Sequence, residues 1–194
     1  MAVMTVAVSM FTSMVIATAR QRGVNRENAI ASNAARVMVE LMRNEEFADV
    51  YALYNEDPDD DPSGAGTAPG HRFAVEGLTP LDSSPDGLIG EIEFPEVYVE
   101  VEVTEEGTGG TGGGGPQKMM GGAAPSTEWV WQLREDYQDT RLGMPRDLNG
   151  DSMVDDQDHQ GDYVILPVHV QLRWRGRFGE RVLDLYTQIA AFKK

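Results

Sequence analysis

The chain has no cysteine among its 194 residues, so disulfide bonds, thiolate metal sites and cysteine nucleophiles are excluded. Its three histidines, His71, His159 and His169, are far apart in sequence and show no paired ligand spacing. The sequence also lacks a Ser-His-Asp order, a His-x-x-x-His pair and paired catalytic glutamates. Adjacent carboxylates such as Asp155 and Asp156 rarely face one another. We therefore predict that the protein is not an enzyme and has no small-molecule substrate.

Basic residues are scarce. Lysine and arginine total 16 against 32 acidic residues, which gives a net charge of -16 and a pI near 4.4. Such a surface repels nucleic acid, so we expect no nucleic-acid partner. One C-terminal segment concentrates four arginines, either as a solvated face or as an anion-binding patch: Arg173, Arg175, Arg177 and Arg181. The length suits one domain with its own core better than two domains.

The first 19 residues, MAVMTVAVSMFTSMVIATA, carry no charge. A helix of that length spans roughly 28 Å, close to the hydrocarbon thickness of a bilayer. A secretory signal peptide would need a basic start and a shorter apolar run. We therefore predict that residues 1–22 form a hydrophobic helix, inserted in a membrane or buried in a bundle of helices.

Beyond Gly23 the pattern becomes amphipathic, and residues 23–50 are predicted to continue the same helix. Its apolar residues recur at helical spacing: Ile30, Ala34, Val37, Met38 and Leu41. The simplest interpretation is one helix over about residues 2–45, whose second half packs on the rest of the chain through this stripe.

Residues 51–194 are predicted to form a globular head. Pro- and Gly-rich composition predicts flexible loops at 56–70 and 104–126. Strand-like patterns cover residues 88–94, 97–103 and 127–133, and residues 162–190 read as two strands joined by a turn at 175–180. The expected fold is α+β: a long N-terminal α-helix packed on an antiparallel β-sheet, ending in a long β-hairpin.

Two segments carry a family resemblance. Arg20-Gln21-Arg22, followed by ENAIASNAAR at residues 27–36, resembles the helix of PilV-type minor pilins and of type II secretion minor pseudopilins. The closing VHVQLRWRGRFGERVLDLYTQIA resembles the terminal hairpin of these proteins. The chain thus resembles the type IV pilin and pseudopilin family over roughly its first 45 and last 30 residues.

This resemblance implies a pilin-like fold and a structural role. The chain would be a minor pilin or pseudopilin, held in the inner membrane by its helix and assembled into a type IV pilus or a type II secretion pseudopilus. Its partners would be other pilin or pseudopilin subunits, contacted through that helix. The head would be extracytoplasmic, on a cell-surface or periplasmic filament.

The family's basic leader, its cleavage site and its early glutamate do not stand in this sequence. We expect either that the true start lies upstream of Met1 or that the chain is not processed in this way. The alternative function is a membrane-anchored, calcium-binding surface or adhesion module unrelated to pilins.

The stretch DLNGDSMVDDQD at residues 147–158 has the spacing of a calcium-binding loop. The predicted ligands are five side chains and one backbone carbonyl: Asp147, Asn149, Asp151, Asp155 and Asp158, with the carbonyl of Met153. The spacing resembles that of dockerin and related EF-hand-like loops. Ser152 takes the sixth position, where glycine is usual, and Val154 at the eighth is expected to pack inward. An acidic surface loop with chance spacing is the alternative. We predict calcium as the cofactor, acting as a structural clip before the last two strands.

Overall fold

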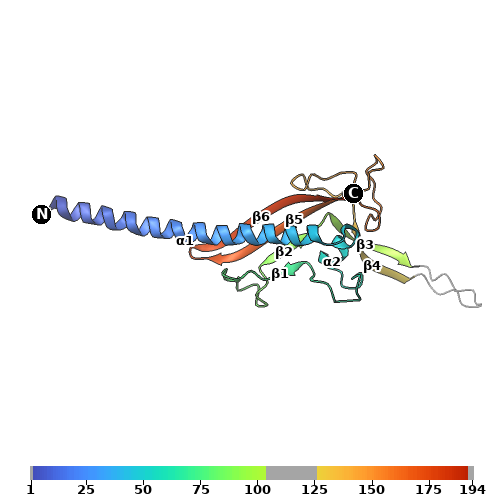
Figure 1. The fold of residues 1–194 in the computed structure, drawn as a ribbon, viewed down its shortest axis with the longest axis horizontal. Coiled ribbons are helices and arrows are strands. Elements are labelled where there is room, and N and C mark those ends of the chain that lie inside the picture. Colours follow the sequence, from blue (N-terminus) through green and yellow to red (C-terminus); the bar gives the residue numbers. More distant parts are fainter. Residues whose placement is uncertain (1, 104–125, 192–194) are drawn as a thin grey trace, which may run out of the picture.

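The computed structural model describes residues 2–103 and 126–191, with side chains over residues 10–101 and 127–191. A long N-terminal helix, α1 (Ala2–Asn44), precedes an antiparallel four-stranded sheet and a separate two-stranded sheet (Figure 1). The predicted α+β class, with one long helix and an antiparallel sheet, is therefore confirmed. The loop predicted at 104–126 lies, apart from Ser126, outside the described residues.

Helix α1 is continuous across Gly23, which costs only about 1 kcal/mol relative to alanine in a helix interior. Its N-terminal half projects beyond the sheet, while its second half runs along it (Figure 1). Apolar side chains on the projecting half are between 46% and 69% exposed: Met10, Phe11, Met14, Val15 and Ile16. Over the residues that the structure describes, no helix has the length and apolar character needed to cross a membrane.

The buried stripe of α1 differs from the predicted one. The side chains that reach the core lie four, four and three residues apart and begin with two alanines: Ala31, Ala35, Val39 and Met42, with Ala34 and Met38 partly buried beside them. Val37 and Leu41, predicted to face the core, are instead 49% and 46% exposed. Apolarity alone could not choose between two adjacent stripes. The alanine stripe lets the helix backbone lie closer to the sheet than larger residues would allow.

The four-stranded sheet has the order β1-β2-β5-β6, with every neighbouring pair antiparallel. Its strands are β1 (Arg72–Phe73), β2 (Gly90–Glu93), β5 (Ile165–Gly176) and β6 (Gly179–Ala190). Alternate residues of β5 are fully buried against α1 and the loops: Leu166, Val168, Val170, Leu172 and Trp174. Gly90 is required in β2 because a Cβ there would lie 2.2 Å from the ring of Phe73.

Two short helices, η1 (Phe47–Asp49) and α2 (Val50–Tyr54), follow α1, and α2 buries Val50, Tyr51 and Tyr54 in the core. Strands β3 (Glu96–Val103) and β4 (Ser126–Leu133) pair with each other as the two-stranded sheet. This ribbon extends from the end of the head that lies farthest from the N-terminus (Figure 1).

A buried histidine joins three strands on the face of the sheet opposite the core. His169 of β5 is 4% exposed, and its ring contacts Glu93 Oε2 of β2 at 2.7 Å and Asp184 Oδ1 of β6 at 3.0 Å. Tyr186 stacks on it with the ring centroids 4.2 Å apart. Burial lowers the pKa of His169, but the hydrogen bonds and charges of the two carboxylates outweigh it and leave the pKa above its ordinary value.

We predict that His169 makes stability depend on pH in a defined direction. Because its pKa is raised by folding, its contribution to the free energy of unfolding is complete below about pH 6.5 and is lost as pH rises through the folded-state value. Chemical denaturation between pH 5.5 and about 9 should show the advantage of the native chain over His169→Gln shrinking with pH. His71→Gln, at a partly exposed histidine, is the control, and a constant or growing advantage would contradict the assignment.

Candidate functional site

The predicted calcium loop lies in the irregular connection between β4 and β5. Leu148 anchors it in the core with no exposed surface, and the Val164 amide donates to the Leu148 carbonyl at 2.7 Å. Tyr163 ties the end of the same connection to the helical region, because its hydroxyl donates to the Phe47 carbonyl at 2.7 Å. The loop is therefore fastened to both the sheet and the segment after α1.

Within the loop, polar side chains fold back on the backbone. Asp147 accepts hydrogen bonds from the amides of Gly150 at 2.5 Å and Ser152 at 2.8 Å. The side chains of Asn149 and Asp151 each accept from the amide two residues further on, at 3.0 and 2.7 Å. These are Asx turns, which let Asn and Asp organise a tight loop without regular secondary structure.

Two details of the loop bear on the expected calcium geometry. Ser152 adopts a φ of 72°, the left-handed conformation for which glycine is favoured at that position. The prediction that Val154 packs inward is wrong, because its side chain is 49% exposed. The apolar anchor is Leu148 instead, at the second position of the loop, because that residue lies against the start of β5.

Glu135, which no sequence pattern predicts as a site residue, holds the loop at its start and at its ninth position. It is 1% exposed, and its Oε1 accepts from the amides of Leu148 at 2.5 Å and Asn149 at 3.3 Å. Its Oε2 accepts from the amide of Asp155 at 3.3 Å. A buried carboxylate is tolerated here because backbone donors surround it. No local pattern marks Glu135, since its partners lie beyond it in the chain.

His159 adds a second charged group beneath the loop. It is 4% exposed, and its Nε2 contacts Asp155 Oδ1 at 3.1 Å while its Nδ1 contacts Asp162 Oδ1 at 3.0 Å. Burial lowers the pKa of His159, but these hydrogen bonds and the nearby charge of Glu135 leave it raised overall. The Gln157 amide and then His159 hold the pKa of Asp155 below its ordinary value.

Over the described residues, one group of three side chains is close enough to share a metal ion: Glu135, Asp155 and His159, whose ligand atoms lie within 4.8 Å of one another. Of the predicted ligands, only Asp155 belongs to this group. Asp158 turns elsewhere, since its Oδ1 accepts from the Leu133 amide at 3.1 Å. The spacing Asp155-x-x-x-His159 is the one sequence signal of this group, and it differs from the His-x-x-x-His pair of typical helical metal sites.

The two ligand sets suit different ions. Calcium takes six to eight oxygens, and the loop side chains of Asp147, Asn149 and Asp151 could supply part of this set after leaving their backbone hydrogen bonds. One imidazole with two carboxylates combines nitrogen and oxygen ligands, both of which zinc accepts. Because both ring nitrogens of His159 already contact carboxylates, a metal on the second set would have to displace one of them.

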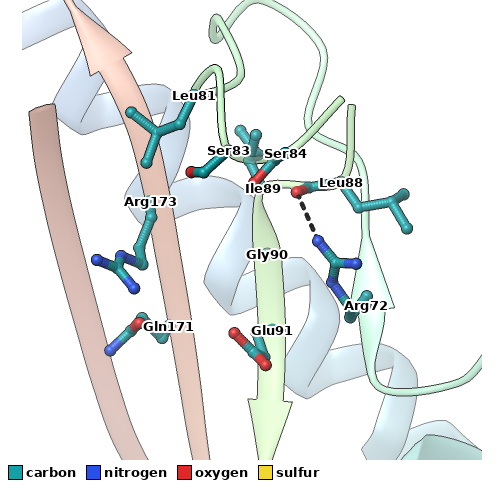
Figure 2. Close-up of a pocket in the computed structure, with 10 residues that line it drawn as sticks. All are labelled: Arg72, Leu81, Ser83, Ser84, Leu88, Ile89, Gly90, Glu91, Gln171 and Arg173. Carbon is teal, nitrogen blue, oxygen red and sulfur yellow. Dashed lines mark hydrogen bonds between the residues drawn. The ribbon is translucent and has the colours of Figure 1, made fainter. Parts of the chain in front are cut away.

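A small cavity lies against β2 and β5, and its lining includes none of Glu135, Asp155 and His159 (Figure 2). Its volume is about 90 Å³, well below the roughly 300–1,000 Å³ of pockets that take small-molecule ligands. Its arginines are already engaged, Arg72 with Asp86 and the Leu88 carbonyl, and Arg173 with Glu180. The cavity therefore offers no free basic group for a ligand.

None of the protein-family models, curated proteins or solved structures compared with the chain matches the chain.

We predict that Glu135→Gln destabilises the protein by about 1–3 kcal/mol, the cost of leaving a buried donor without its acceptor. The amide keeps the shape of the side chain, but one of its two ends can no longer accept a backbone hydrogen bond. Urea denaturation measures the change. Glu128→Gln removes the same charge from an exposed position on β4 and should change stability little, so equal losses in the two variants would refute the assigned role.

Proposed function

We propose that this chain is a structural subunit of a pilin-like filament, a minor pilin or pseudopilin of a type IV pilus or a type II secretion pseudopilus. The observation that carries the proposal is the division of α1 into two halves. Ala31 and Ala35 bind the second half to the head, while Met10, Phe11 and Met14 of the projecting half are exposed. Apolar side chains on one unaccompanied helix gain stability by packing on other helices.

The other elements support the same function. Strands β5 and β6 run antiparallel over their whole length with a turn between Gly176 and Gly179, which fits the long terminal hairpin of the family. In this proposal the head contacts partner subunits and does not catalyse a reaction. The buried groups Glu135, His159 and His169 serve to hold backbone and side chains in place. Before assembly, the uncharged residues 1–19, of which residues 1–9 lie outside those described with side chains, hold the subunit in the inner membrane, with the head outside the cytoplasm.

Calcium binding by residues 147–158 belongs to this proposal. The left-handed conformation at Ser152 and the ordered oxygens of Asp147, Asn149 and Asp151 support it. A single extracellular loop of this kind binds calcium with a Kd of about 10⁻⁴ to 10⁻³ M. The ion would stabilise the connection that leads into β5.

We predict that the projecting half of α1 contacts other subunits. A photo-cross-linking amino acid at Met14, in the full chain expressed in its own cells, should yield adducts with the apolar helices of further pilin-like subunits, because these helices pack together in the filament. Mass spectrometry of the adducts identifies the partner.

The same probe at Met153, which is 64% exposed on the head, is the control and should give no helix adducts. Adducts with lipid alone at Met14 would contradict the filament function and favour the membrane-anchored calcium-binding surface or adhesion module.

We predict that calcium raises the melting temperature. At ten to one hundred times Kd the ion adds about 1–3 kcal/mol of stability, and Asp151→Ala should abolish the rise because it removes a central ligand. Asp156→Ala, an exposed carboxylate outside the predicted set, should retain it. Differential scanning calorimetry with calcium and, separately, with zinc makes the measurement. Loss of the rise in His159→Gln but not in Asp151→Ala would assign the metal to the other cluster.

A further inference from the structure

The head has a second cavity, at the end where β2 finishes and β3 begins, with a volume of about 250 Å³. This is less than a drug-sized ligand needs and suits a single side chain. Its walls carry the carboxylates of Glu56, Glu91, Glu93 and Glu96 and the rings of Trp131 and Tyr137, and no lysine or arginine lines it.

The carboxylates of this cavity are only partly compensated. Glu96 accepts from the Tyr51 hydroxyl at 2.7 Å, and Glu93 contacts His169. Within the described residues, no hydrogen bond or ion pair engages the side chain of Glu56 or Glu91. Burial raises the pKa of Glu96 to about 7. The hydrogen bond from Tyr51 opposes this rise, and the charges of nearby carboxylates add to it. Two basic groups act electrostatically on Glu93: His169, which contacts it directly, and Arg141, which is itself paired with Asp139.

Aromatic rings form the rest of the wall. Trp131 of β4 lines the cavity. The centroid of the Tyr98 ring on β3 lies 4.8 Å from the centroid of the Trp131 ring. Tyr98 in turn stacks on Trp129 at 5.3 Å, and both are about half exposed. A guanidinium group binds favourably both to carboxylates and to the faces of such rings. The cavity therefore has the chemistry of a receptor for an arginine side chain.

At the other end of the same head lies an arginine whose side chain pairs with no described residue. Three of the four arginines near the β5–β6 turn are engaged: Arg173 with Glu180, Arg175 with Asp82, and Arg181 with Glu27 and Asn28. No ion pair or hydrogen bond with a described residue engages Arg177, at the tip of the turn. Its neighbour Phe178 is 54% exposed beneath the guanidinium of Arg20.

The two features lie at opposite ends of the head along α1. The β5–β6 turn lies beside the middle of the helix, whereas β3 and β4 leave the head beyond the helix's C-terminal end (Figure 1). The turn cannot reach the cavity of its own chain. A contact between different surfaces of two copies repeats from copy to copy and, where the rotation does not close a ring, builds an open filament.

We propose that Arg177 of one copy docks into the cavity formed by Glu56, Glu91, Glu96 and Trp131 of the next copy, with Phe178 at the rim of that cavity. The inference rests on the proposed function and deepens it, because it names the contact between successive heads. Arg177 supplies the positive charge that the cavity lacks, and Phe178 extends the aromatic contact toward Trp131. Charge complementarity selects the register, since the rest of the acidic surface repels other copies.

The absence of cysteine makes a direct test available, because each engineered thiol is unique in its chain. Full-length Phe178→Cys and Glu56→Cys proteins, distinguished by size tags, are mixed in membranes and mildly oxidised. A disulfide-linked heterodimer is expected, measured on a non-reducing gel. Glu76→Cys, which replaces an exposed glutamate outside the cavity, is the matched control for Glu56→Cys and should give little heterodimer.

Charge changes at Arg177 then test the recognition itself. In the Phe178→Cys protein, Arg177→Glu should lower heterodimer formation about tenfold or more, and Arg177→Lys should retain much of it. Equal cross-linking with Glu56→Cys and Glu76→Cys, or an Arg177→Glu variant that cross-links normally, would overturn the inference. If helix adducts form at Met14 but this disulfide does not, the docking proposal is wrong and the filament function stands.

If the disulfide forms without helix adducts, two copies dock as proposed but the filament function is wrong. If neither the adducts nor the disulfide forms, both proposals are wrong.

Discussion

The contact between one narrow stripe of α1 and the sheet positions every other part of this molecule. Ala31 and Ala35 bring the helix backbone close to β5, and Val39 and Met42 complete the seal near the start of η1. A helix fixed at its second half must carry its first half free of the head. The exposed apolar residues around Met14 are therefore a consequence of where the alanines lie, and the filament proposal depends on that division.

The same stripe leaves other apolar residues available. Val37 and Leu41 lie on the exposed side of α1 at the level of the head, and Val182 is exposed on the outermost strand β6. An isolated subunit gains nothing from such residues, whereas neighbouring subunits could cover them. The helix thus offers one surface to its own sheet and another to solvent or partners, with the boundary between the two set by side-chain size.

A few buried acidic side chains, rather than the large net charge of the chain, determine how the head folds around its carboxylates. Glu135 folds the irregular connection by accepting backbone donors from the start and the ninth position of the loop, and His159 offsets part of the acidic charge beside it. At the β2–β3 junction, Glu96 has no comparable set of donors, so its burial is costly. This contrast separates an internally satisfied cluster from one that is open to a cation, although both are acidic in composition.

The sequence by itself determined the long helix, the α+β class, the positions of the main strands and the tight acidic loop. Each of these follows from local spacing, through helical or alternating apolar patterns, or through Asn and Asp turns. Only the tertiary structure decided which stripe of α1 is buried, that Leu148 rather than Val154 anchors the loop, and that Glu135 and His159 join Asp155. It also decided that the acidic cavity and Arg177 lie at opposite ends. These outcomes depend on segments that lie far apart in the chain and compete for the same core surface and the same backbone donors. A local sequence pattern cannot predict which segment occupies them.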